Sequence, residues 1–409
     1  MPKSLENNAA PPVPLEVRIT ESGEALLAGL SGVLRQVPSA DAGPQRLATA
    51  LGVDKVLASR LLKAVRGGDA MSVLHRAPGP EPLRRVLRAC SKAGVEPDAL
   101  AEAHAAVDLF ESLIRSEVGD RSGLEAILSA WIPEARRDFE LRRKQAAFRA
   151  MSQLKGMHAD AFAEAAIFWP SDDGERVDVV WLKAVIGLRC LRPGAVVRFT
   201  SQRSIEDAAG RRPRTLEGEP VESVANTVVP EFCSSPTPEL TGNVVGEMTH
   251  YTLDRVSLGQ SADVVTCEVN RAEIARYLPA SRGRRAWASS DTAICSRVLQ
   301  LDVLVHPDVF PGERPDLRIY DSAIRGTADR NDPSRDIDQL DLLESIDELG
   351  VGIDRFGSSH VPRYRSLLRH TCECLGYDGD LLRGYRVSSD YPVYGSQYAM
   401  SFRTTEPPA

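Results

Sequence analysis

A change in hydrophobic periodicity near residue 165 most constrains the fold of this 409-residue chain. Before it, apolar residues recur at the three- and four-residue spacing of amphipathic helices, as in Leu26, Leu30 and Val33. After it, short β-branched runs are separated by loops and by two or three helical segments. A chain of this length exceeds one ordinary core. We therefore predict an α+β multidomain protein, with an all-α N-terminal part and a C-terminal α/β domain whose sheet is mixed or antiparallel.

The same pattern predicts four segments. Residues 1–18, rich in Pro, Asn and Ala, are expected to be disordered. Residues 19–95 form a helical domain whose first helix starts near Ser22, and no β-hairpin wing is expected in it. Residues 96–164 form a helical connector that is expected to dimerise. Residues 165–409 form the α/β domain.

Within the α/β domain, we predict individual elements from local composition. Strands are expected at residues 165–169, 196–200, 264–269, 298–306, 385–389 and 397–403. Helices are expected at residues 179–191, 336–349 and 361–375. The segment 206–222, rich in Arg, Gly, Pro and Glu, is expected to be a mobile surface loop.

Residues 47–62 have the spacing of two short helices joined by a tight turn. Ala48 is small where the helices would cross, and Gly52 follows at a position that suits a left-handed backbone. Asp54 can cap the second helix by accepting bonds from its free N–H groups. The expected core side of this helix is Val53, Leu57, Ala58, Leu61 and Leu62. The expected outward face is Lys55, Val56, Ser59, Arg60 and Lys63.

This segment resembles the helix-turn-helix of bacterial transcriptional regulators, in which the pattern LGVSxxTVSRxL is common. The chain has LGVD at residues 51–54 and ASRLL at residues 58–62. Asp54 stands where serine is usual, and Leu57 and Ala58 stand where threonine and valine are usual. The resemblance covers about 20 residues, and a purely structural pair of helices is the alternative interpretation.

The resemblance implies a sequence-specific regulator that binds double-stranded DNA as a homodimer. Ser59 and Arg60 would contact base edges in the major groove. The phosphate contacts would come from Arg46, Lys55, Lys63 and Arg66. By analogy with such regulators, the C-terminal domain would sense a small-molecule effector or bind a partner.

Charge supports a nucleic-acid partner for this region. From Arg35 to Lys92 there are eleven lysines and arginines against four acids, so the segment has a net charge of +7, whereas the whole chain has −7. A basic module on an acidic protein is the electrostatic pattern expected when one domain faces nucleic acid. A solvated basic face is the alternative.

The C-terminal part lacks the common catalytic motifs, and we expect no cofactor and no metal. His370, Cys372 and Cys374, with His360 nearby, could suggest zinc or a redox thiol, but positions 370 and 372 do not share a helix face, which favours ordinary packing. Four tyrosines near two arginines could line a small-molecule pocket, although a tyrosine-rich sheet edge is favoured. These are Tyr385, Tyr391, Tyr394 and Tyr398, beside Arg383 and Arg386.

Neither a signal peptide nor an apolar run of roughly 20 residues is present, and the seven cysteines have no framework spacing. A cytoplasmic protein without membrane contact is therefore expected. Two other functions stay open. The C-terminal domain could be an enzyme that the helix-turn-helix delivers to its target, or the helix pair could serve protein contacts in an assembly.

Overall fold

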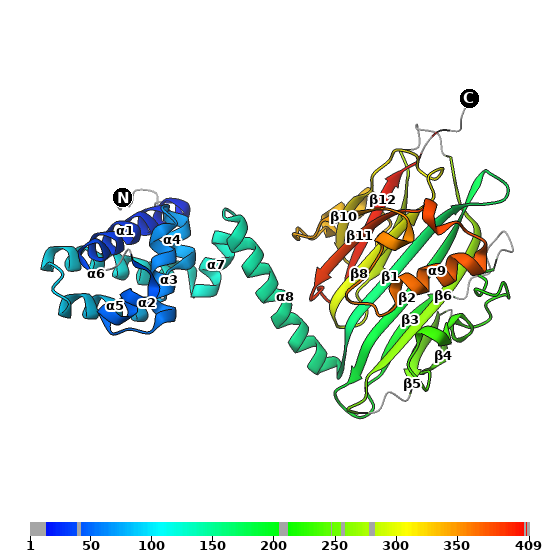
Figure 1. Cartoon of the computed structure of the whole chain (residues 1–409), viewed down its shortest axis with the longest axis horizontal. Coiled ribbons are helices and arrows are strands. Elements are labelled where there is room, and N and C mark those ends of the chain that lie inside the picture. The colour runs from blue at the N-terminus through cyan, green and yellow to red at the C-terminus, as the bar shows by residue number, and fades with distance from the viewer. Residues whose placement is uncertain are drawn as a thin grey trace, which may run out of the picture. The chain divides into compact units, whose positions relative to one another are not determined.

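The structure, a computed structural model, describes residues 14–38, 42–203, 212–246, 248–254, 258–277, 283–404 and 406. It divides into two compact units, Met1–Glu140 and Leu141–Ala409. A helical region, blue to cyan in Figure 1, is followed by a β-rich region, green to red. The predicted fold class is confirmed. Residues 1–13 of the segment expected to be disordered lie outside the described residues, and the first helix begins at Leu15, before the expected Ser22.

Helices account for nearly all of the N-terminal unit. They are α1 Leu15–Gln36, α2 Pro44–Leu51, α3 Lys55–Arg66, α4 Ala70–Arg76, α5 Pro80–Lys92, α6 Pro97–Ser112, the π-helix η2 Leu113–Val118, α7 Arg121–Ser129 and α8 Pro133–Lys155. Helix α4 occupies the place where a winged regulator would have a hairpin, in agreement with the prediction. Helix α8 spans the division between the two units. No helix in the described part of the chain is both long and apolar enough to cross a membrane.

Two glycines let α1 approach its neighbours closely. A Cβ atom on Gly23 would lie 2.4 Å from the carbonyl oxygen of Ala70 at the start of α4. A Cβ atom on Gly29 would lie 2.9 Å from the Cα atom of Ala103 in α6. Since real Cβ atoms do not approach backbone atoms this closely, α1 packs on α4 and α6 only because these positions carry no side chain.

The C-terminal unit is built on one six-stranded sheet with the order β10-β11-β8-β1-β2-β6. Its strands are β1 Met157–Pro170, β2 Arg176–Cys190, β6 Ala262–Ala275, β8 Ser296–Val305, β10 Ile346–Val351 and β11 Arg383–Asp390. Only β1 and β8 pair in parallel, so the sheet is mixed. The strands begin at Met157, earlier than the expected boundary at residue 165.

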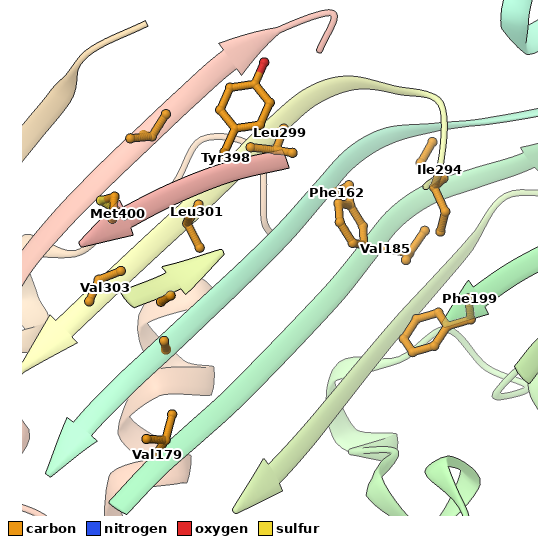
Figure 2. Close-up of a cluster of buried hydrophobic side chains, with 14 of the residues drawn as sticks. Phe162, Val179, Val185, Phe199, Ile294, Leu299, Leu301, Val303, Tyr398 and Met400 are labelled. Atoms are coloured by element: carbon orange, nitrogen blue, oxygen red, sulfur yellow. The ribbon is translucent and has the colours of Figure 1, made fainter. Parts of the chain in front are cut away.

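Two three-stranded antiparallel sheets accompany the large sheet, with the orders β7-β12-β9 and β3-β5-β4. Their strands are β3 Val197–Arg203, β4 Glu239–Val245, β5 Met248–Asp254, β7 Arg285–Asp291, β9 Asp316–Asp321 and β12 Ser396–Arg403. Both small sheets contribute to the core on one face of the large sheet. In Figure 2, Tyr398 and Met400 of β12 lie beside Leu299 and Leu301 of β8. Phe199 of β3 lies in another part of the same core, away from β12.

The opposite face of the large sheet is covered by α9 Tyr364–Leu375 (Figure 1), which confirms the helix expected at residues 361–375. Alternating residues of β1 divide between the two cores, because side chains along a strand point to opposite faces. Phe162 and Ala166 face the small sheets, whereas Ala163 and Ile167 face α9. The large sheet is therefore buried on both faces.

This burial explains why the helix predicted at residues 179–191 is wrong. The segment is the strand β2, which pairs with β1 and β6. A strand buried on both faces has a continuous apolar run instead of alternation, and such a run cannot be distinguished from a buried helix by periodicity.

The helix predicted at residues 336–349 is also wrong. Asp332 does cap a helical turn, with its side chain accepting from the Ser334 N–H at 2.9 Å, but this turn is a short 3-10 helix, η6 Pro333–Asp338. The rest of the segment pairs with strands: the Leu340 N–H donates to the Ile319 carbonyl at 2.8 Å, and β10 pairs with β11. Tertiary pairing has overridden the local helical pattern.

The six predicted strands correspond to β1, β3, β6, β8, β11 and β12, each longer than or shifted from the expected range. The expected mobile loop at residues 206–222 lies partly outside the described residues. Its later part is ordered, because the Arg214 N–H donates to the Val269 carbonyl of β6 at 2.9 Å and Leu216 is buried.

Candidate functional site

The motif region of the N-terminal unit forms two short helices, α2 and α3, joined at Gly52. Gly52 has φ 61° and ψ 34°, the left-handed conformation that glycine adopts without steric cost. Asp54 precedes α3, and its carboxylate accepts from the Leu57 N–H at 2.8 Å. Asp54 therefore caps α3, at the position where the regulators that this segment resembles usually have serine.

The apolar side of α3 is buried as its periodicity predicts. Leu57, Ala58, Leu61 and Leu62 belong to the core of the N-terminal unit, and Val53 packs against that core from the turn. From α2, the core receives Leu47, Ala48 and Leu51. The small side chain of Ala48 is 6% exposed, so the helix pair is anchored along its inner side.

The outer side of α3 presents cations around one exposed apolar residue. Lys55, Arg60 and Lys63 are exposed, Ser59 is half-buried, and Val56 is 69% exposed. Arg46 of α2 and Arg66 at the end of α3 are exposed as well. All six residues predicted to contact DNA therefore have solvent access, and five of them carry positive charge.

The exposed cations of this surface have no acidic partners in the part of the chain that the structure describes. Among the described residues, Arg46, Lys55, Arg60, Lys63 and Arg66 form no ion pair. Other arginines of the same unit do. In α5, Arg84 pairs with Asp108 at 2.6 Å and with Glu111, and Arg88 pairs with Glu81 at 2.9 Å. We call the five unpaired cations with Val56 and Ser59 the α2–α3 surface.

The residues considered for metal binding do not assemble a site. Cys374 Sγ lies 3.8 Å from His370 Nε2 on α9, whereas Cys372 is buried in the core against the sheet. Burial raises the pKa of the Cys372 thiol to about 12, so it stays protonated at neutral pH. Within the described ranges, no group of three or more His, Cys, Asp or Glu side chains could hold a metal ion.

The four tyrosines do not form one pocket. Tyr385 and Tyr398 are buried in the core, and the Tyr398 hydroxyl donates to Ser389 Oγ at 2.9 Å. Tyr391 packs on Phe148, with ring centroids 5.3 Å apart. Tyr394 lies apart from these and lines a large cavity.

That cavity is a feature that we did not predict from the sequence. It has a volume of about 940 Å³ and opens between the two small sheets, over the large sheet. Strands β1, β2 and β6 supply its floor, β3 and β7 supply two walls, and loops including Tyr394 complete it. Aromatic rings line it at five positions: Phe162, Trp181, Phe199, Trp287 and Tyr394.

An ion pair between a half-buried lysine and a buried glutamate crosses the cavity floor. Lys183 Nζ of β2 lies 2.8 Å from Glu164 Oε1 of β1, and the glutamate side chain is only 8% exposed. The ammonium group also lies 5.8 Å and 5.7 Å from the ring centres of Phe162 and Phe199, within range for cation–π attraction. Both charges could have been noticed in the sequence, because each interrupts an otherwise apolar run, AFAEAAIF and VVWLKAVI.

Asp291, the last residue of β7, is a second acid in the cavity. Its Oδ2 accepts from Thr327 Oγ1 at 2.9 Å, whereas its Oδ1 is buried and has no hydrogen-bond partner among the described residues. Burial raises the pKa of Asp291 above its usual value, the Thr327 hydrogen bond lowers it, and Glu164 raises it further. An unsatisfied buried acceptor costs free energy, which a donor from a ligand could recover.

Comparison of the chain with protein-family models, with curated proteins and with solved structures gave no match.

Proposed function

We propose that this chain is a sequence-specific DNA-binding transcriptional regulator, with the α2–α3 surface as its DNA interface and the C-terminal unit as a sensor of a ligand or partner. The observation that carries the proposal is a set of five exposed cations that have no ion-pair partner among the described residues, on two helices whose turn and cap fit a helix-turn-helix. Unpaired cations held on a rigid surface suit phosphate binding, since no internal acid competes with the phosphates.

The proposed roles follow from position and side-chain chemistry. Helix α3 would enter the major groove, where Arg60 can donate two hydrogen bonds to guanine and Ser59 can bond to several bases. Val56 would contact a thymine methyl group. The other cations of the α2–α3 surface, Arg46, Lys55, Lys63 and Arg66, would hold phosphates on either side.

We further propose a homodimer bound to two half-sites about one helical turn apart. A ligand of the C-terminal unit would regulate DNA binding if it bound one arrangement of the dimer better than the other. Such coupling is what regulators of this organisation commonly use, and it is proposed by analogy.

The test is binding of the full-length protein to duplex DNA across a series of salt concentrations. Removal of one cation that binds a phosphate of B-DNA should reduce the slope of log affinity against log salt by about 0.9. We expect Lys63→Ala and Arg66→Ala each to reduce the slope by about this amount per protomer. The matched control is Arg88→Ala, which removes an exposed arginine of α5 that already pairs with Glu81.

Equal slopes for Lys63→Ala, Arg88→Ala and the wild type would contradict the proposed interface. Binding that does not weaken with salt would instead favour a protein partner for these helices, because a buried apolar contact does not release counterions.

A further inference from the structure

The cavity of the C-terminal unit has the size and lining of a small-molecule site. Its volume of about 940 Å³ lies within the range of about 300–1,000 Å³ that is usual for ligand pockets. Its floor belongs to the large sheet, where Lys183 of β2 pairs with Glu164 of β1 on one side and with Thr266 of β6 on the other, so the floor is a rigid surface.

The aromatic lining fits a flat apolar body. Trp181 and Phe162 lie on neighbouring strands of the floor, and Trp287 lies on the β7 wall. Figure 2 shows Phe162 on β1 and Phe199 on β3 in the same region of the core. Rings on both the floor and a wall can contact a planar ligand from more than one side.

The described residues around the cavity favour a cation over an anion. Among them, three acids line it, Glu164, Glu268 and Asp291, and two cations, Lys183 and Arg198. Lys183 is neutralised by Glu164 at 2.8 Å, and Arg198 is solvent-exposed. The Glu268 carboxylate accepts from the Asn270 side-chain amide at 3.1 Å.

Asp291 is the group that most needs a ligand donor. Its buried Oδ1 has no partner among the described residues, although Thr327 satisfies the other oxygen. An ammonium or amidinium N–H that reaches the Asp291 carboxylate from the cavity would form a charge-assisted hydrogen bond, which is about twice as strong as a neutral one.

We propose that this cavity binds a small organic cation with a planar ring, whose N–H groups pair with Asp291 while the ring stacks on Trp287 and Trp181. The binding itself is independent of DNA. Only the use of this ligand as the effector rests on the proposed function.

The test is isothermal titration calorimetry of the full-length protein with matched probes. Benzamidine is compared with neutral benzamide, and tryptamine is compared with the anion indole-3-acetate. We expect at least one of the two cations to bind saturably, with at least tenfold higher affinity than its matched probe. Its affinity should rise from acidic to neutral pH, because ionised Asp291 is the binding form.

Two variants locate the site. Asp291→Asn, which keeps the side-chain shape, should weaken binding of the cation at least tenfold, and Trp287→Leu should weaken it severalfold. The matched control Asp347→Asn changes an exposed acid of β10 outside the cavity lining and should leave the affinity unchanged.

Three results would each overturn the proposal. They are the absence of saturable binding for both cations, a neutral or anionic probe that binds at least as tightly as its matched cation in both pairs, and unchanged affinity in Asp291→Asn. Because no DNA is present, these results leave the regulator proposal untouched, and a failure of DNA binding leaves this one untouched.

Discussion

The buried ion pair between Asp302 of β8 and Arg386 of β11 gives a quantitative test of how the C-terminal unit is held together. Arg386 donates from Nε to Asp302 Oδ1 at 2.8 Å and from Nη2 to Oδ2 at 2.7 Å. The Asp302 side chain is 0% exposed. Tyr364 of α9 also donates to Oδ2 at 2.7 Å, so the pair links the helix to the sheet that carries the cavity floor.

We expect Arg386→Met to lower the free energy of unfolding of this unit by about 3 kcal/mol. Breaking a buried pair by removing one partner costs about 3–5 kcal/mol, because the remaining charge is buried and unpaired. The lower end applies here, since the Tyr364 hydroxyl still satisfies part of the Asp302 carboxylate. Adding Asp302→Asn to Arg386→Met should recover much of the loss, because no buried charge then remains.

The assay is urea denaturation followed by tryptophan fluorescence, to which the C-terminal unit contributes three of the four tryptophans. The control is Arg369→Met, which removes an arginine that is 50% exposed and pairs with Asp354, itself 76% exposed. An exposed pair contributes only about 0–1 kcal/mol. If Arg386→Met cost no more than Arg369→Met, the buried network would not stabilise the fold as argued.

Three further predictions concern single positions. Asp54→Ala should lower the stability of the N-terminal unit by about 1 kcal/mol in thermal unfolding, because α3 loses its cap; an unchanged melting temperature would show that the cap contributes nothing. Gly29→Val should lower the free energy of unfolding by about 1–3 kcal/mol, because its Cβ would meet α6. Gly32→Ala has nothing within 4 Å of the new Cβ and should stabilise the same helix by up to about 1 kcal/mol. Similar effects of the two substitutions on stability would refute the close packing of α1. Because the pKa of Asp291 is raised in the fold, the folded state binds more protons than the unfolded state, so the stability that this group contributes falls as the pH rises above the ordinary aspartate pKa. In urea denaturation, the free energy of unfolding of Asp291→Asn relative to the wild type should therefore increase toward neutral pH. If this difference in free energy stayed constant with pH, it would contradict the raised pKa.

The local features of α2 and α3 were predictable because adjacent residues determine them. The left-handed turn at Gly52 and the cap at Asp54 depend on contacts within a few residues. The alternation of buried and exposed positions on α3 follows from helix geometry alone. Sequence reasoning therefore identified the inner and outer sides of α3 residue by residue.

The errors in the C-terminal unit arose where distant pairing decides the structure. Strand β2 has an apolar run that fits a helix equally well, and only its neighbours β1 and β6 make it a strand. The cavity was missed for the same reason, since Asp291 of β7 is far in the sequence from Glu164 and Lys183, and the three line one cavity only in the folded unit. Two sequence signals pointed to it: the charged residues within two apolar runs, and Tyr394 among the tyrosines considered for a small-molecule pocket.

The most direct test of the central proposal is selection of genomic DNA fragments by the full-length protein at near-physiological salt, beside an Arg60→Ala, Lys63→Ala double variant. We expect the wild type to enrich one inverted-repeat sequence and the double variant to lose this enrichment, because one residue reads bases and the other holds phosphate. Enrichment of no sequence by the wild type, or recovery of the same fragments by the double variant, would contradict DNA recognition by the α2–α3 surface.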